Sequence, residues 1–257
     1  MKTDRAVPAR SGWAGPALLV LWMLLLWLAP RVAEATFLVG LRADDQVVLG
    51  SDSRVIGPGG TVPRSDTCKI HQGRGCFFAL SGPITGPGYD AIAIARQACA
   101  QGRDVDAIVD GFMNAVEGPY KAMHAWMLKN ESEWALKRAP LSLDVFVIGR
   151  RDGQLVMMHT GYASKPSVFA RLPRAEVKNG DAQFTRARDL PRFLAQNPSW
   201  FQPPFARAAE RLVDASMASG WVDVGPPVAV LQVDATGAKW FRQGLCPAID
   251  PTLWSTE

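Results

Sequence analysis

Short apolar runs alternate along this chain with stretches of helical spacing. Two strand-like runs come first, at residues 36–43 and 47–51, with a polar turn between them. This hairpin would place Asp52, which follows its second strand, beside the start of its first strand. A second hairpin is predicted from residues 69–72 and 76–80 around a glycine-rich turn.

Helical spacing begins at Tyr89 and ends at Gln101, and a second helix starts near Asp104 and reaches Met127, with Gly118-Pro119 allowing a bend. Further strands, a third helix and two closing strands follow at residues 143–149, 154–158, 167–172, 204–219, 228–233 and 239–242. This order predicts one α+β domain, a four-layer αββα sandwich in which helices cover both outer faces of two sheets.

The first 35 residues have the three parts of a secretory signal peptide. A cationic start to Arg10 precedes an apolar core of 13 residues, Ala17–Ala29, and the small residues Ala33 and Ala35 end the segment. Thirteen helical residues span roughly 20 Å, short of a hydrocarbon core of about 30 Å. We therefore expect residues 1–35 to be a cleaved signal peptide and residues 36–257 to be the mature domain. The alternative is an uncleaved leader that tethers the protein to a membrane.

Composition restricts the partners of the mature chain. The sequence is 48% hydrophobic and 20% charged, with a formal net charge of +4, of which residues 1–35 contribute half. No basic run with interleaved aromatic residues occurs, so we expect no nucleic-acid partner. No later segment is apolar enough to span a membrane, which predicts a periplasmic or secreted protein with no membrane contact after cleavage.

The cysteines and histidines give no indication of a metal or cofactor. The four cysteines, Cys68, Cys76, Cys99 and Cys246, allow three disulfide pairings, and a Cys68–Cys76 bridge across the second hairpin is one option. They would equally serve as small buried apolar residues. The three histidines are scattered and no Cys-x-x-Cys motif is present. We expect neither a metal site nor a cofactor.

Cleavage after Ala35 would make Thr36 the first residue of the mature protein. Its hydroxyl would then lie beside a free α-amine, so that a single residue would supply nucleophile and base. The pKa of a free α-amine, about 7.7–8.0, leaves a neutral fraction able to accept the hydroxyl proton. Within the precursor the same nitrogen is an amide and has no basicity. The structural alternative is a β-branched residue that starts a strand.

Three further positions are candidates for the chemistry. Lys69 would act as a cation that lowers the pKa of the Thr36 hydroxyl, and Asp52 would hold this lysine and the α-amine in place. The backbone at Ser81 and Gly82 is the candidate oxyanion hole, with the donor at Gly82 because Pro83 has no N–H. The structural alternatives are a solvated lysine, a capping aspartate and a plain turn.

The residues from Thr36 to Gly82 resemble proteasome β-type subunits. The likeness rests on Thr36-x-Leu-Val-Gly, Val-Leu-Gly-Ser-Asp52-Ser-Arg54, Lys69-Ile and Leu-Ser-Gly82, and the order of elements extends it to residue 242. It implies the fold of N-terminal-nucleophile (Ntn) hydrolases and catalysis by Thr36, Asp52 and Lys69. With the leader in view, we expect an exported bacterial protein. Arg54 matches an element with a structural role.

The second half matches the family by pattern only. Where family enzymes carry supporting polar residues, this chain has Asn179-Gly180-Asp181 and Asp223, and we expect Asp223 to take one supporting role. The leading hypothesis is an exported threonine hydrolase of peptides or small amides, released by signal peptidase and able to form homo-oligomers. The alternative is a catalytically silent proteasome-like scaffold or binding subunit.

Overall fold

The computed structural model of the chain describes residues 37–43, 45–56, 63–64, 67–130, 142–165, 168–185, 194–218 and 224–254. By its internal contacts the chain divides into Met1–Arg31 and Val32–Glu257, and every described residue belongs to the second unit. The leader, Thr36 and Asp223 lie outside the described residues. Cleavage after Ala35, the nucleophile and one supporting residue therefore remain predictions.

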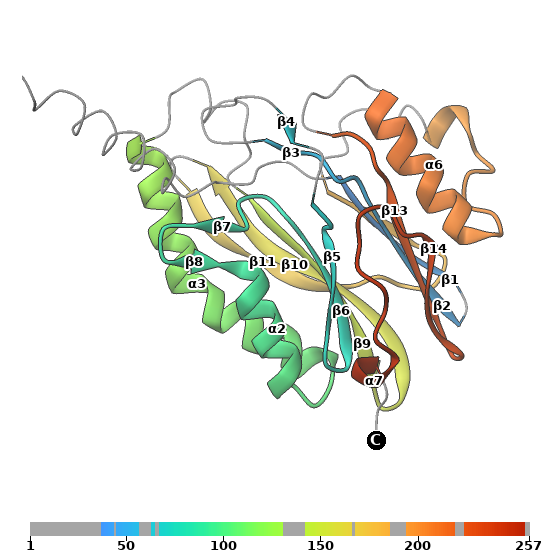
Figure 1. The fold of residues 1–257 in the computed structure, drawn as a ribbon, viewed down its shortest axis with the longest axis horizontal. Helices are drawn as coiled ribbons and strands as arrows, with labels where there is room; N and C mark the ends of the chain where they lie inside the picture. Colours follow the sequence, from blue (N-terminus) through green and yellow to red (C-terminus); the bar gives the residue numbers. More distant parts are fainter. Residues whose placement is uncertain are drawn as a thin grey trace, which may run out of the picture. The chain divides into compact units, whose positions relative to one another are not determined.

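Two five-stranded antiparallel sheets form the centre of the fold (Figure 1). The first sheet consists, in spatial order, of β12 (Ala182–Phe184), β1 (Leu38–Ala43), β2 (Gln46–Ser51), β13 (Ala229–Asp234) and β14 (Gly237–Arg242). The second consists of β11 (Val168–Glu176), β10 (Gln154–Lys165), β9 (Leu143–Arg151), β6 (Cys76–Ser81) and β5 (Ile70–Gly73). Both predicted hairpins, β1–β2 and β5–β6, are confirmed.

Helices and short strand pairs complete the described chain. The helices are α2 (Ala91–Gln101), α3 (Val105–Asn130), α6 (Phe205–Ala218) and α7 (Pro251–Trp254). The short pairs are β3 (Val55–Ile56) with β4 (Pro63–Arg64), and β7 (Thr85–Gly86) with β8 (Tyr89–Asp90). α2 begins two residues later than predicted because Asp90 caps it, accepting a hydrogen bond from the backbone N–H of Ala93. α3 continues through Pro119.

Three hydrophobic cores hold the elements together. The first lies between α2, α3 and one face of the second sheet, and the second contains side chains from both sheets. The third packs α6 against the first sheet. Each sheet is thus covered on both faces, with α2 and α3 on one side and α6 on the other (Figure 1).

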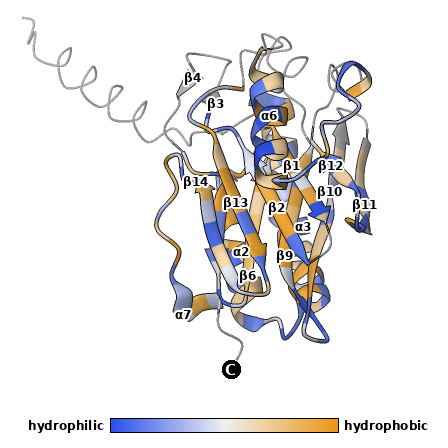
Figure 2. Cartoon of the chain, turned by 90° about the vertical axis from the view of Figure 1, so that its right-hand side faces the viewer, coloured by the Kyte–Doolittle hydropathy of each residue, from blue (hydrophilic) through white to orange (hydrophobic). Residues whose placement is uncertain are grey.

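The apolar runs of the sequence follow from this burial. Successive strand residues point to opposite faces, so a strand buried on both faces needs no polar alternation. In β1, Leu38 enters the core between the sheets while Val39 faces α6. The helix α6, exposed on its outer side, carries separate polar and apolar faces, whereas the central strands are apolar along much of their length (Figure 2).

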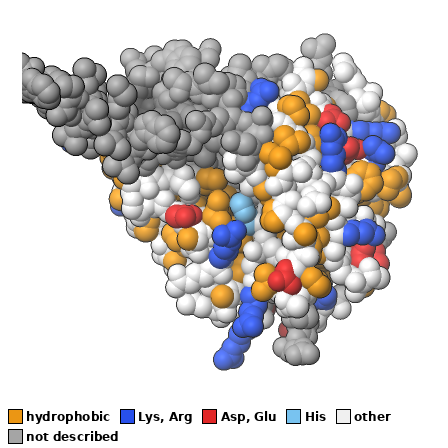
Figure 3. Space-filling model, in the orientation of Figure 1, with side chains coloured by type: hydrophobic (Ala, Val, Ile, Leu, Met, Phe, Trp, Pro, Cys, Tyr) orange, Lys and Arg blue, Asp and Glu red, His pale blue; other side chains and the backbone are white. Residues whose placement is uncertain are grey.

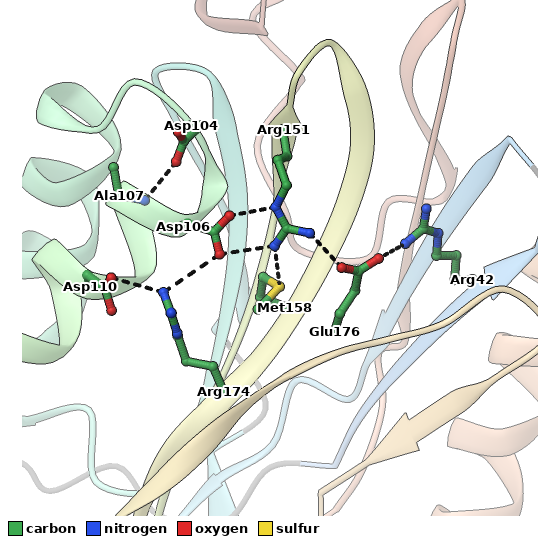
Figure 4. Close-up of polar contacts among 9 residues, drawn as sticks. All are labelled: Arg42, Asp104, Asp106, Ala107, Asp110, Arg151, Met158, Arg174 and Glu176. Atoms are coloured by element: carbon green, nitrogen blue, oxygen red, sulfur yellow. Dashed lines mark hydrogen bonds and ion pairs between the residues drawn. The ribbon is translucent and has the colours of Figure 1, made fainter.

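A network of charged side chains joins the elements at the end of β1 away from Phe37 (Figure 4). Glu176 binds Arg42 of β1 at 2.5 Å and Arg151 of β9 at 2.6 Å, and Arg151 also binds Asp106 of α3 at 2.6 Å. Hydrogen bonding to Arg151 lowers the pKa of both Asp106 and Glu176. The network connects α3 with strands of both sheets.

Two disulfides link distant parts of the chain. Cys68 pairs with Cys246, and Cys76 of β6 pairs with Cys99 of α2. The Cys68–Cys76 option is therefore wrong. The absence of a side chain at Gly73, in the adjacent strand, leaves room for the Cys76–Cys99 bridge. A Cβ at Gly73 would collide with Cys99. By the loop-closure entropy of the unfolded chain, the Cys68–Cys246 bridge stabilises the fold by about 5 kcal/mol. The Cys76–Cys99 bridge, which closes a shorter loop, contributes about 3 kcal/mol.

The imidazole of His71 is largely buried against its neighbours. It lies on β5 with its ring centroid 5.3 Å from that of Phe78, and its buried Nε2 has no hydrogen-bond partner among the described residues. Burial and, to a smaller extent, the charge of Arg96 lower the pKa of His71 to about 4, while the charge of Asp90 opposes the shift. The folded protein therefore holds this ring neutral.

We predict that acid destabilises the protein through His71. The unfolded ring binds a proton below its ordinary pKa of about 6.5, whereas the folded ring binds one only near about 4, so the stabilisation is present above about pH 6.5 and is lost as the pH falls. Chemical denaturation should show the unfolding free energy falling by about 2 kcal/mol between about pH 7.5 and about pH 5. A His71→Phe variant should lose that slope; an unchanged slope would contradict the assignment.

Candidate functional site

The first hairpin brings Asp52 to the residue that follows Thr36. Leu38 pairs with Ser51, so the residues just outside the ladder, Phe37 and Asp52, face each other. The backbone N–H of Phe37 donates to Asp52 Oδ1 at 2.9 Å, and the N–H of Asp52 is 3.4 Å from the carbonyl oxygen of Phe37. The N–H of Phe37 belongs to the peptide bond that joins it to Thr36. Asp52 thus contacts the chain one residue from the predicted nucleophile.

Lys69 meets Asp52 in the interior. Its Nζ lies 3.5 Å from Asp52 Oδ1, and the two side chains are 2% and 0% exposed. Lys69 also donates to the carbonyl oxygen of Arg54. Asp52 follows β2 of the first sheet and Lys69 precedes β5 of the second, so this ion pair joins the two sheets. The structure brings the two predicted residues together, and their catalytic roles remain predictions.

Three backbone N–H groups surround the Asp52 carboxylate. Oδ1 accepts from Phe37, and Oδ2 accepts from Arg54 at 3.0 Å and from Gly225 at 3.1 Å. Burial raises the pKa of Asp52 above its ordinary value, while Lys69 and these three donors act to lower it. The carboxylate is thereby fixed in orientation at both oxygens.

Gly225 contacts the Asp52 carboxylate, and the sequence did not indicate this. Its N–H binds Asp52, and its carbonyl oxygen accepts from Ser53 at 3.1 Å. A Cβ at this position would collide with the guanidinium of Arg54, which lies across the glycine. Arg54 therefore packs against the backbone next to Asp52, in keeping with the structural role expected for it.

Thr185 holds the next residue of β1. The N–H of Leu38 donates to Thr185 Oγ1 at 2.9 Å, and the N–H of Thr185 donates to the carbonyl oxygen of Leu38 at 3.0 Å. The other polar stretch of the second half, Asn179-Gly180-Asp181, is not beside the site, because its backbone pairs with Arg42 at the opposite end of β1. Thr185 is a buried hydroxyl near the start of the strand, and no sequence motif marked it.

Ser81 and Gly82 lie at the same end of the second hairpin as Lys69. The pairing of Ile70 with Ala79 places the residue before β5 and the last residues of β6 together. Gly82 has a φ of +102°, and a Cβ there would collide with the carbonyl oxygen of Ser142. Tyr89 donates from its hydroxyl to the carbonyl oxygen of Pro83 at 3.0 Å. The turn at Gly82 and Pro83 is therefore fixed by the Ser142 backbone and by the hydrogen bond from Tyr89.

The described ranges offer neither a metal centre nor a membrane span. They contain no cluster of three or more His, Cys, Asp and Glu side chains arranged to hold a metal ion. None of their helices combines the length and apolar composition that a membrane crossing requires.

The chain has a mixed α/β fold with antiparallel sheets, and comparison with solved structures suggests a proteasome-like fold. One similar structure is the Gly-1 mutant of Anbu from Hyphomicrobium sp. strain MC1, with a TM-score of 0.57. The match covers 82% of this chain and 87% of that one at 10% sequence identity, which shows a shared fold alone. No protein-family model and no curated protein matches the sequence.

We predict that Asp52 and Lys69 are energetically coupled. Replacing Asp52 with Ala should lower the unfolding free energy by about 3–5 kcal/mol, because the buried Lys69 ammonium would lose the carboxylate that faces it. The double variant Asp52→Ala/Lys69→Met should recover part of this loss, since it also removes the buried positive charge. Chemical denaturation of the two single variants and the double variant measures the coupling.

Asp234→Ala provides the control for this cycle. Asp234 accepts hydrogen bonds from Thr236 and Gln232 and lies 3.8 Å from the exposed Lys239 ammonium, and its loss should cost about 1 kcal/mol, well below the loss expected at Asp52. Additive effects of the Asp52 and Lys69 substitutions would show that the pair makes no net interaction.

We also predict that Gly82 tolerates no side chain. Gly82→Ala should destabilise the protein by roughly 2–4 kcal/mol, because the methyl group meets the backbone of Ser142 in a conformation that already disfavours L residues. Gly88→Ala is the matched control, since Gly88 has a φ of +67° but open space around its Cα. Thermal unfolding should separate the two variants, and equal losses would exclude the collision as the cause.

Proposed function

We propose that this chain is an exported hydrolase of amide or peptide bonds whose nucleophile is Thr36, freed by cleavage of residues 1–35. The observation that carries the proposal is the buried Asp52–Lys69 pair, whose carboxylate binds the N–H of Phe37. A costly ion pair at this position has a chemical purpose if the preceding residue is the first of the mature chain.

The proposed reaction divides into acylation and hydrolysis. Thr36 Oγ attacks the substrate carbonyl carbon, and its proton passes to the α-amine, directly or through a water molecule. Lys69 favours the developing negative charge on Oγ, and the N–H of Gly82 donates to the oxyanion. The C–N bond breaks as the leaving amine takes the proton, and water then hydrolyses the threonyl ester. Ser81 and Asp223 are proposed to support this geometry.

Export is supported by the cysteine chemistry. All four cysteines are paired, and such bridges persist in oxidising compartments such as the periplasm and the extracellular space. The proposal therefore places cleavage by signal peptidase before activity and the mature protein in the periplasm or outside the cell.

The arrangement of the cores supports the finer assignment of the fold. Helices α2 and α3 cover one sheet, α6 covers the other, and the sheets share a core, as in a four-layer αββα sandwich of Ntn hydrolases. We propose a peptide or small amide as substrate, no metal or organic cofactor, no nucleic-acid partner, and assembly with further copies of the chain.

We predict that the exported protein begins at Thr36 and hydrolyses an acyl-amide probe. Intact-mass measurement and N-terminal sequencing of the exported fraction test the cleavage. Thr36→Ala should reduce turnover by at least about 1000-fold with little change in stability, because only the nucleophile is lost. Thr36→Ser, which keeps a hydroxyl and the α-amine, should retain measurable activity.

A different first residue would overturn the mechanism, because Thr36 Oγ would then have no adjacent α-amine. A chain that begins at Thr36 but turns over no probe would favour the silent scaffold. A chain that keeps its leader would favour the tethered alternative.

A further inference from the structure

A segment near the C-terminus runs along the outer edge of the second sheet. We call residues Cys246–Trp254 the C-terminal strap. It meets β5 and its flanking residues at three places: Cys68 forms a disulfide with Cys246, Gln72 exchanges two hydrogen bonds with the backbone of Asp250, and the N–H of Gly75 donates to Leu253. Residue numbers rise together along both segments, so the strap runs parallel to β5. It covers the edge of the last strand of its sheet.

Both ends of the strap are fixed. At its start, Cys246 is 4% exposed and belongs to the core between the sheets. At its end, the ring of Trp254 lies 5.0 Å from that of Phe77 in the same core. The strap is thus anchored at both ends in the core between the sheets, while most of the residues between its ends are exposed.

The first attachment adjoins the candidate site. Cys68 immediately precedes Lys69, and the ladder of β5 begins only at Ile70. The backbone at Lys69 therefore lies between a hydrogen-bonded strand and a covalent anchor to the strap. The Lys69 ammonium must reach both Asp52 and the carbonyl oxygen of Arg54. These two partners follow β2 of the first sheet, whereas Lys69 precedes β5 of the second.

We propose that the Cys68–Cys246 disulfide is a positioning element for Lys69, which holds the lysine on Asp52 by tying its backbone to the C-terminal strap. The proposal rests on the function proposed above, because it assigns the bridge a role in the same site. Its effect passes through Lys69, so Cys68 and Cys246 are positioning residues. Cys76–Cys99, which joins β6 to α2, has no such role.

The matched comparison is between two variants that each remove one bridge. Cys68→Ser/Cys246→Ser removes the proposed positioning bridge, and Cys76→Ser/Cys99→Ser removes the other. Acetic anhydride labelling of the full mature protein, read by mass spectrometry, reports the exposure of Lys69 without requiring activity. Lys69 is 2% exposed and should label at least about tenfold more slowly than Lys239, which is 64% exposed.

We expect the first variant to raise Lys69 labelling severalfold and the second to leave it unchanged. In the acyl-amide assay the first variant should lose about 10- to 100-fold in kcat, with a shifted pH profile and little change in KM, because a misplaced group weakens the chemical step. The second variant should keep the wild-type profile. Equal behaviour of the two variants, or Lys69 that stays protected in the first, would overturn the proposal.

Gln72→Ala tests the same idea if the first variant fails to fold. It removes both side-chain hydrogen bonds to Asp250 and leaves the disulfide intact, so Lys69 labelling should rise by a smaller factor. Unchanged labelling in this variant would count against the strap. A wild-type protein without hydrolytic activity would refute the proposed function, while the labelling result would still decide the positioning role.

Discussion

The buried ion pair between Asp52 and Lys69 is the interaction on which the arrangement of this end of the molecule depends. Removing two charges from water costs several kcal/mol, and the attraction between them repays this only if their remaining hydrogen bonds are made. Here the carboxylate receives N–H groups from Phe37, Arg54 and Gly225, and the ammonium reaches the carbonyl oxygen of Arg54. The start of β1, the end of β2, and the segments before β5 and β13 must therefore all be in register.

The rest of the fold supplies that register. In the first sheet, alternate side chains of a strand enter the core between the sheets and the core under α6. A slip of one residue would move every side chain of the strand from one core to the other, so the register is fixed. At the other end of β1, Arg42 joins an ionic network that includes Arg151 and Asp106. On the face seen in Figure 3, acidic and basic side chains lie side by side on the α6 side. Glu210 of α6 binds both Arg207 and Arg242. These partly exposed pairs contribute little stability singly and serve mainly to fix orientation.

Much of this architecture could be predicted from the sequence because it follows local patterns. The hairpin β1–β2 was evident from two apolar runs around a polar turn, and it placed Asp52 beside the start of the first strand, where Asp52 contacts Phe37. Thr185 and Gly225 could not be found in that way, because each reaches the site from more than 140 residues along the chain and lies in no motif. The disulfide pairing could not be chosen from the sequence for a related reason: four cysteines allow three pairings, and both Cys68 and Cys76 pair with residues brought near by the tertiary fold.

A role in stability alone does not explain why the residues that join the sheets here, Asp52 and Lys69, are charged. Two apolar side chains of similar volume would join the sheets at least as well as a buried ion pair, which in several proteins can be replaced without loss of stability. The chain instead keeps a carboxylate with three backbone donors and a lysine whose neighbour is covalently anchored. Such an arrangement fixes charge at a defined point, and fixed charge stabilises a developing anion without reorganisation. The point that it fixes adjoins the residue which cleavage of the leader would expose.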